Sequence, residues 1–371
     1  MKNDVYYINY PSIFCGTDKS EIHFEKGTPD LVSVFKPGDT AENRRFFVTD
    51  ATVASLPCMS EFISKFDDNV CGQDLLIVLG SGEPYKTIET VLTIIQTALE
   101  AGFTRNDTFV GIGGGVICDT TSFAASIFKR GASVQLVPTT LLAMVDASIG
   151  GKTGVDFAKY KNMIGTFFPA QKLFYFPEFI QSLSDTQYKS GLAEAIKTAI
   201  LFDKELYDIF KNNPEQIKKR DKELLDVIIT KSVQAKASVV EKDFTEKNIR
   251  ATLNLGHTFG HAFESVAGLG AVTHGEAVAW GIGRAVCVSC NKEYCREDFK
   301  NEILELLSLY DFETSPLPSV ISGGGVGDRL LSAMHKDKKN INNKVRAIIP
   351  KAVDDIVIEE IEDSEILQVL K

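Results

Sequence analysis

Residues 108–119 read TFVGIGGGVICD, and this stretch decides the fold of the first half of the chain. Thr108–Ile112 is a short apolar run typical of a buried strand, and three consecutive glycines follow it before a helical pattern begins. Glycine lets the backbone approach a ligand closely, and the N–H groups at the start of a helix attract phosphate. The order of strand, glycine loop and helix indicates a variant nucleotide-binding loop. A tight glycine turn is the alternative.

Strands and helices alternate on both sides of this loop. The helical pattern TIETVLTIIQTALEAG is stopped by Gly102. Such alternation predicts an α/β, Rossmann-like architecture with a mostly parallel sheet and helices on both faces. The other predicted strands are Arg45–Thr49, Leu75–Leu79, Ser133–Val137 and Leu173–Phe176.

The pattern becomes mainly helical after Pro177. From Asp185 to Leu309 the apolar residues recur at helical spacing, and two short strand-like runs follow near 345–349 and 355–358. We therefore expect two domains, an α/β domain over 1–178 and a mainly helical domain over 179–371.

Composition and charge exclude several classes of function. The net charge of −10 and the pI of about 5.2 argue against nucleic-acid binding as the main task. The sequence has neither an apolar run long enough to span a membrane nor an apolar signal core at its start. Seven scattered cysteines do not resemble a disulfide framework, which favours the cytoplasm, and Cys287 and Cys290 are expected to be buried or half-buried thiols.

Three of the five histidines, His257, His261 and His274, are concentrated in one short segment. His257 and His261 are four residues apart and would share one face of a helix, and a glycine-containing turn could bring His274 to the same point. Neutral imidazole is the commonest protein ligand of zinc, and catalytic zinc usually takes three protein ligands. The cluster therefore predicts a metal site, with metal-free, hydrogen-bonded histidines as the alternative.

A carboxylate upstream is the expected partner of these histidines. Glu194 and Lys197 lie three apart in SGLAEAIKTAI, where the other positions are small or apolar. Charged side chains on such a helix are costly to bury unless they are paired or bound to something. Glu194 is therefore the predicted ligand, with a plain Glu–Lys pair as the alternative. Arg250 and Asn254 would lie on the same side as His257 if their helix is continuous.

Polar residues also gather near the ends of the predicted strands, where ligands bind in open α/β sheets. A carboxylate at a strand end suits a ribose hydroxyl, although Asp is also a common helix N-cap. Lys and Asn donors suit phosphate or carboxylate groups, although such residues also occur in solvated loops. The residues that stand out on these grounds are Asp50, Glu83, Lys86, Thr139, Thr140, Asp146, Lys152, Lys161 and Asn162.

The ordered set of motifs resembles 3-dehydroquinate synthase and its sugar-phosphate cyclase relatives from about Asp50 to Pro350. The strings that carry the resemblance are GGGVICD, RGASVQLVPTTLLAMVDASIGGKTG, KNMIG, SGLAEAIK, NLGHTFGH, HGEAVA and DKK. The resemblance implies a dehydroquinate-synthase-like fold with NAD bound by the N-terminal domain. It also implies Zn²⁺ or Co²⁺ bound by Glu194, His257 and His274, with His261 outside the ligand set, and a homodimer.

The resemblance also implies a role for each matched residue. The substrate phosphate would contact Lys152, Asn162, His261, Lys338 and the neighbouring subunit's Arg130. The substrate carboxylate would contact Arg250 and Lys236, and its hydroxyls Asp146, Lys197 and Asn254. The implied catalytic residues are Asp146, Lys152, Lys197, Asn254 and His261. The NAD site would comprise Asp50, Glu83, Lys86, Gly114, Gly115, Asp119, Thr139, Thr140, Lys161 and Phe179.

The implied activity is that of a carbon–oxygen lyase acting on a small sugar-acid phosphate in the shikimate pathway. It converts 3-deoxy-D-arabino-heptulosonate 7-phosphate to 3-dehydroquinate by transient oxidation with NAD, loss of phosphate, re-reduction and intramolecular aldol closure.

Several residues depart from the family pattern. Cys118 stands where Gly is usual, and Ser182 where Thr is usual. Asp156, Phe157 and Tyr160 stand where Asn, His and Gly are expected. Two other activities remain as alternatives to dehydroquinate formation on the same architecture: that of another sugar-phosphate cyclase and that of a metal-dependent polyol dehydrogenase. A non-catalytic NAD-binding module is a further alternative, and it predicts loss of metal ligands or anion-binding residues, whereas this sequence keeps both.

Overall fold

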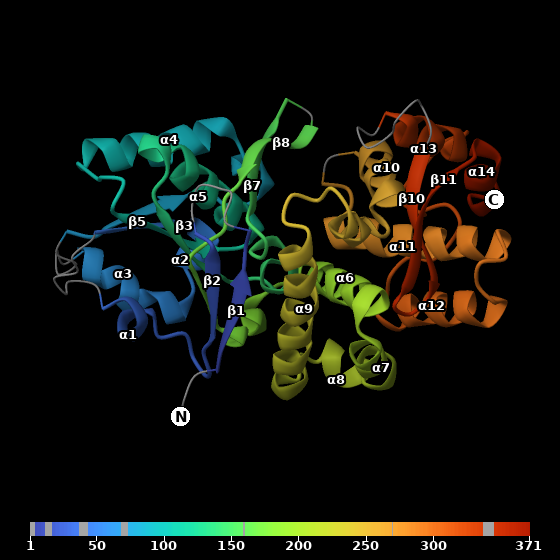
Figure 1. Ribbon diagram of the computed structural model, residues 1–371, viewed down its shortest axis with the longest axis horizontal. Coiled ribbons are helices and arrows are strands. Elements are labelled where there is room, and N and C mark those ends of the chain that lie inside the picture. The colour runs from blue at the N-terminus through green and yellow to red at the C-terminus, as the bar shows by residue number, and fades with distance from the viewer. Residues whose placement is uncertain are drawn as a thin grey trace. The chain divides into compact units, whose positions relative to one another are not determined.

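The computed structural model describes residues 4–11, 17–36, 44–67, 73–158, 160–268, 270–336 and 345–371. It divides into two compact units, drawn in Figure 1. The first comprises Met1–Leu183 together with Lys236–Thr245, and the second comprises Ser184–Ala235 together with Glu246–Lys371. The first unit thus includes a short segment that returns to it from the helical half of the chain.

A seven-stranded sheet organises the first unit. Its strands are parallel except for β1, which pairs antiparallel with β2 at one edge. The chain passes from β3 outward to β4 and then returns to place β5 on the other side of β3. This reversal marks the point at which ligands bind in sheets of this type. The spatial order is β1 (Asp4–Asn9), β2 (Lys19–Phe24), β9 (Lys172–Tyr175), β6 (Ser133–Pro138), β5 (Thr108–Gly113), β3 (Arg45–Asp50) and β4 (Leu75–Leu79).

Helices and turns connect these strands, and aromatic side chains pack between the sheet and the helices α1 (Leu31–Phe35) and α3 (Ser60–Asp67). Phe47 is fully buried and packs edge-to-face against Phe35 and Phe62, a geometry that favours aromatic pairs. The helical elements are α1 (Leu31–Phe35), α2 (Ala51–Ala54), η1 (Pro57–Met59), α3 (Ser60–Asp67), η2 (Glu83–Tyr85), α4 (Ile88–Glu100), α5 (Gly115–Ile127), η3 (Phe128–Arg130), the π-helical turn η4 (Ala143–Ala147) and η5 (Pro177–Ser182). A separate hairpin pairs β7 (Lys152–Phe157) with β8 (Tyr160–Phe167).

The second unit is mainly helical. Trp280 is fully buried in its core against Phe259 and Phe263, and its indole N–H donates to the carbonyl of Ser315 at 2.9 Å. The elements are α6 (Asp185–Phe202), α7 (Lys204–Asn212), α8 (Pro214–Lys218), α9 (Lys222–Lys242), η6 (Ile249–Asn254), α10 (His257–Ala267), α11 (His274–Asn291), α12 (Glu297–Leu309), α13 (Val326–His335), the antiparallel pair β10 (Val345–Ala352) and β11 (Asp355–Ile361), and α14 (Asp363–Val369). The last turns of α9, from Lys236, belong to the first unit.

These elements confirm the predicted fold class. Each predicted strand of the first half is present within a residue or two of its expected bounds, and Cys287 and Cys290 on α11 are half-buried free thiols. In the described part of the chain, every helix is too short or too polar to cross a bilayer.

The segment from Arg250 to His257 is not one continuous helix. The 3₁₀ turn η6 ends at Asn254, and Gly256 then adopts a left-handed backbone with φ of 81° before α10 begins at His257. Arg250 and Asn254 are therefore not on one continuous helix with His257, so the condition under which they would lie on the same side is not met. A residue with a side chain at Gly256 would meet the carbonyl oxygen of Val278 at 2.5 Å, so close packing against α11 fixes the break.

Candidate functional site

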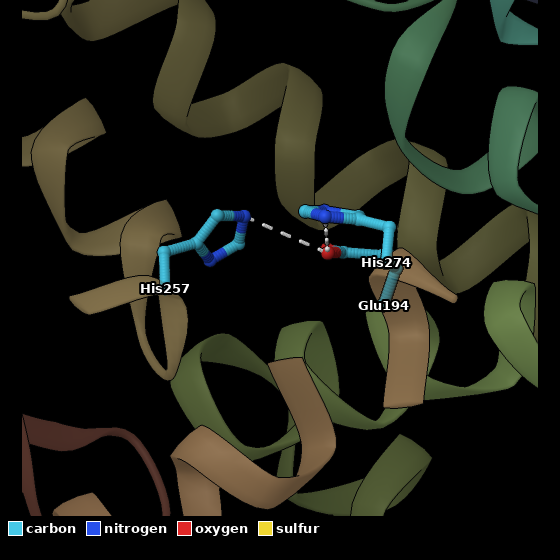
Figure 2. A group of neighbouring side chains, drawn as sticks. All are labelled: Glu194, His257 and His274. Atoms are coloured by element: carbon cyan, nitrogen blue, oxygen red, sulfur yellow. Dashed lines mark ion pairs between the residues drawn. The ribbon is translucent and has the colours of Figure 1, made fainter. Parts of the chain in front are cut away.

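Three side chains from three helices of the second unit converge on one point (Figure 2). Glu194 lies in the middle of α6, while His257 and His274 are the first residues of α10 and α11. The potential ligand atoms of all three lie within 4.8 Å of one another. Glu194 Oε1 is 3.3 Å from His274 Nε2 and 3.8 Å from His257 Nε2. One carboxylate and two imidazoles form a donor set suited to a catalytic zinc ion with an open position.

The start of α11 is fixed by its local sequence. Thr273 and Glu276 form a capping box, in which each side chain accepts a hydrogen bond from the other's backbone N–H. The Gly275 N–H donates to Ser190 Oγ at 3.1 Å, and a Cβ at Gly275 would lie only 2.4 Å from the Ser190 backbone. Glycine at 275 therefore lets α11 approach α6 closely enough to bring His274 beside Glu194.

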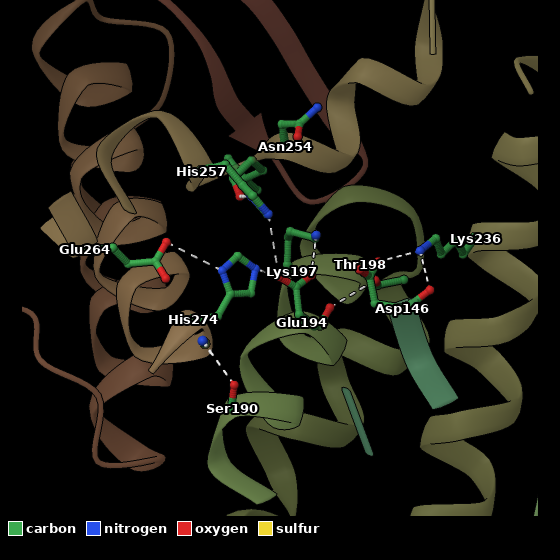
Figure 3. Close-up of polar contacts among 12 residues, drawn as sticks. Asp146, Ser190, Glu194, Lys197, Thr198, Lys236, Asn254, His257, Glu264 and His274 are labelled. Atoms are coloured by element: carbon green, nitrogen blue, oxygen red, sulfur yellow. Dashed lines mark hydrogen bonds and ion pairs between the residues drawn. The ribbon is translucent and has the colours of Figure 1, made fainter. Parts of the chain in front are cut away.

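A second carboxylate faces the other side of the His274 ring (Figure 3). Glu264 Oε2 lies 3.7 Å from His274 Nδ1, while Nε2 of the same ring faces Glu194. Burial lowers the pKa of His274, but the neighbouring carboxylates of Glu194 and Glu264 outweigh burial and raise that pKa to about 9. Lys197, one turn along α6, forms an ion pair with Glu194, and both side chains are almost fully buried. Glu194 therefore belongs both to the Glu–Lys pair, which is the alternative interpretation of this helix, and to the group that could hold a metal.

The remaining predicted residues of the second unit lie in η6 and α10, apart from one outside the described residues. Arg250 is 1% exposed. Asn254 Nδ2 donates to Glu246 Oε1 at 2.7 Å. The His261 ring lies 5.4 Å from that of His257 and 6.5 Å from that of His274, centroid to centroid, so it is near the three-residue group without joining it. Lys338 lies outside the described residues.

In the first unit, most of the predicted nucleotide residues lie just past the carboxyl ends of neighbouring strands. Asp50 ends β3 and caps α2, and its Oδ1 accepts from the N–H groups of Thr52 and Val53 and from Ser81 Oγ. Oδ2 takes part in none of these three bonds, so the capping role leaves an oxygen available for a ribose hydroxyl.

The glycine loop leads directly into α5. Gly114 is the N-cap of this 13-residue helix and has no side chain to cap the N–H groups of its first turn. A Cβ at Gly114 would lie 3.1 Å from Thr140 Cγ2, just past the end of β6. Gly115 opens the helix, and Thr139 lies buried beside Thr140. Uncapped N–H groups at the end of a parallel strand suit the pyrophosphate of a dinucleotide.

A lysine-centred group lies at the next strand end. Lys86 Nζ is 2.6 Å from Asp119 Oδ2 and donates to Asn162 Oδ1 at 2.7 Å. Burial lowers the pKa of Lys86, but the neighbouring Asp119 outweighs burial and raises it, so Lys86 stays protonated. Glu83 lies in η2, three residues before Lys86, and also raises that pKa.

The other predicted residues of the first unit lie around η4, the hairpin and the return segment. Lys236 Nζ is 2.6 Å from Asp146 Oδ1 and also donates to the Asp146 carbonyl (Figure 3). Lys152 opens β7, Lys161 is exposed in β8, Phe179 is buried in η5, and Arg130 ends η3 with φ of 72°.

Two further residues of these groups are not among the site residues that the sequence predicts. Glu264 follows His257 and His261 at positions i+7 and i+4, so helical periodicity alone would have placed all three on one face of α10. Asp156 was noted only as a departure from the family pattern, and no local sequence signal indicates its contact with Asn162.

The fold and these groups define a class of protein in which a Rossmann-like unit is joined to a helical unit that carries a carboxylate–imidazole metal group. Comparison with known proteins identifies the member of this class: the chain belongs to the 3-dehydroquinate synthase family. Residues 76–190 match the family model described as 3-dehydroquinate synthase N-terminal, and residues 191–340 match the C-terminal model.

Individual relatives agree with this assignment. The 3-dehydroquinate synthase of Rippkaea orientalis is 38% identical over 78% of this chain and 79% of its own length. That of Prochlorococcus marinus is 34% identical over 95% and 96%. Among solved structures, a 2-epi-5-epi-valiolone synthase from Streptomyces hygroscopicus, with NAD⁺ and Zn²⁺ bound, superposes with a TM-score of 0.83. It is 26% identical to this chain, over 95% of each.

Proposed function

We propose that this protein is a 3-dehydroquinate synthase, a phosphate-eliminating carbon–oxygen lyase of the shikimate pathway. Its substrate would be 3-deoxy-D-arabino-heptulosonate 7-phosphate, and its products 3-dehydroquinate and phosphate. The observation that carries the proposal is the converging group of Glu194, His257 and His274 in a chain of this family. A non-catalytic module would have no need of this group.

The two cofactors in this proposal are NAD and Zn²⁺ or Co²⁺. The metal would be held by Glu194, His257 and His274, whose donor types fit it. The dinucleotide would lie along the strand ends that carry Asp50 and Gly114. When bound, NAD supplies a reversible hydride acceptor and the metal supplies Lewis acidity.

The protein's own side chains would hold and orient the substrate. Lys152, Asn162, His261, Lys338 and Arg130 of a neighbouring subunit are proposed for the phosphate, which makes a homodimer the expected functional form. A dianionic phosphate requires several such donors, and an acidic protein of net charge −10 has to concentrate them locally.

The substrate carboxylate distinguishes this reaction from those of related cyclases. Arg250 and Lys236 are proposed to bind it, and both are buried cations, with 1% and 5% of their surface exposed. Asp146, Lys197 and Asn254 are proposed to bind hydroxyl groups, and Lys197 is held by its ion pair with Glu194. A polyol dehydrogenase acts on uncharged substrates and has no use for such a set of cations.

Phosphate release from three sugar phosphates tests the proposal. The enzyme loaded with Zn²⁺ and NAD⁺ is given 3-deoxy-D-arabino-heptulosonate 7-phosphate, sedoheptulose 7-phosphate or glucose 6-phosphate. We expect release only from the first, with 3-dehydroquinate as the product. Release from either of the other two, which lack the carboxylate, would instead assign the protein to another cyclase activity.

A further inference from the structure

The β7–β8 hairpin contains a bulge that directs one residue toward Lys86. Its register shifts between Val155 and Phe157, so the backbone of Asp156 is released from the regular ladder. The Asp156 N–H donates instead to the carbonyl of Lys86 at 2.9 Å. The bulge therefore ties the hairpin to the turn that carries Lys86.

The Asp156 side chain makes a second contact, across the hairpin. Its Oδ1 accepts the backbone N–H of Asn162 at 2.8 Å. Asn162 has φ of 52°, a left-handed conformation that Asn tolerates better than most residues but that still requires support from its surroundings. The carboxylate of Asp156 supplies that support.

Lys86 then determines which end of the Asn162 amide faces outward. An ammonium group has only donors, so the amide atom 2.7 Å from Lys86 Nζ must be the oxygen, Oδ1. The amide nitrogen, with two N–H donors, points away from Lys86. Asn162 is exposed in β8, so these donors are available to an anion.

We propose that Asp156 is a positioning residue for phosphate recognition, which acts by holding Asn162 in the conformation that presents its amide N–H groups. This inference rests on the proposed function, in which Asn162 contacts the substrate phosphate. Asp156 itself does not touch the substrate. The departure from the family pattern at 156 thus lies within the hydrogen-bonded group that orients a phosphate donor.

The test compares Asp156→Ala with Asp156→Asn. Alanine removes the acceptor for the Asn162 N–H, whereas the Oδ1 of asparagine can replace it. For Asp156→Ala we expect the Kd of inorganic phosphate, measured by calorimetry with NAD⁺ present, and the KM of the sugar phosphate to rise about ten-fold, the factor that corresponds to roughly 1.4 kcal/mol. The Kd of NAD⁺ and kcat should stay within about two-fold of wild type, because the main-chain bond from residue 156 to Lys86 survives the substitution. Asp156→Asn should match wild type in all four quantities.

An unchanged phosphate Kd in Asp156→Ala would overturn the inference. Equal losses of phosphate affinity in the alanine and asparagine variants would also overturn it, because they would show that the charge of Asp156 matters and not its hydrogen bond to Asn162. If Asp156→Ala does not fold, Asp156→Ser replaces it, since its hydroxyl lies one bond nearer the main chain and does not reach Asn162. Calorimetry with phosphate is independent of turnover. Wild-type protein that binds phosphate but leaves 3-deoxy-D-arabino-heptulosonate 7-phosphate unconverted would refute the proposed function and not the role of Asp156.

Discussion

Replacing Glu264 should weaken zinc binding although this residue is outside the three-residue group. Glu264 Oε2 lies 3.7 Å from His274 Nδ1, on the opposite side of the ring from Glu194. A carboxylate there holds the ring proton on Nδ1 and leaves Nε2 free to accept a metal. We therefore expect Glu264→Ala to raise the Kd of Zn²⁺.

The expected size follows from the kind of contact that is lost. Carboxylates that orient metal-binding histidines typically contribute roughly ten- to a hundred-fold in metal affinity, which corresponds to about 1.4–2.7 kcal/mol. Glu264→Gln keeps an acceptor oxygen and loses only the charge. Its loss should be about 1 kcal/mol, or roughly five-fold.

The assay is a competition between metal-stripped protein and a chromophoric zinc chelator at fixed pH. Ser265→Ala is the matched control, because Ser265 is the next residue on α10 and is exposed. Circular dichroism checks that each variant is folded. Glu264→Ala and Ser265→Ala with the same zinc affinity would refute the reasoning, as would a glutamine variant weaker than the alanine variant.

Three other perturbations have defined outcomes. His257→Ala removes a proposed ligand and should abolish both bound zinc, measured by atomic emission, and nearly all turnover; survival of both would show that the ligand assignment is wrong. Arg250→Ala should raise the KM of the carboxylate-bearing substrate about ten-fold or more, because a charge-assisted contact is lost, and an unchanged KM would contradict the proposed acid recognition. Glu313→Gln should reduce thermal stability at neutral pH. Hydrogen bonds from Ser315 and then Ser319 lower the pKa of Glu313 to about 2, below its ordinary value of 4.5. This carboxylate therefore stabilises the fold above pH 4.5, and its contribution is lost as the pH falls toward 2. The glutamine variant should show a shallower decline of Tm over that interval, and a decline as steep as wild type would count against the assignment.

Much of the first unit could be predicted because its parallel strands are buried on both faces and read as short apolar runs. Arg45–Asp50 and Thr108–Gly113 are examples, with five buried positions each. The β7–β8 hairpin was not predicted. Its strands carry Lys, Thr, Gly and Asn at positions that resemble a polar loop, and β8 is largely exposed, so no alternation of apolar residues signals it.

The candidate metal group shows the limit of sequence reasoning in another way. The residue types and the spacing of the histidines indicate a metal site, but spacing alone favours His261 together with His257. The break at Gly256 and the approach of α11 to α6 through Gly275 bring Glu194 and His274 to His257 instead. Both depend on contacts between segments far apart in the chain. The resemblance to the family named the three residues that converge here, because it carries that long-range information.

The ratio of product formed to NAD⁺ supplied tests the central claim most directly. Enzyme with Zn²⁺ and substoichiometric NAD⁺ is given 3-deoxy-D-arabino-heptulosonate 7-phosphate, and 3-dehydroquinate, phosphate and NADH are measured together. A synthase that regenerates its cofactor within each cycle should form many molecules of 3-dehydroquinate and phosphate per NAD⁺, with no lasting NADH. NADH that accumulates one-for-one with an oxidised product, without phosphate release, would contradict the account and identify a dehydrogenase.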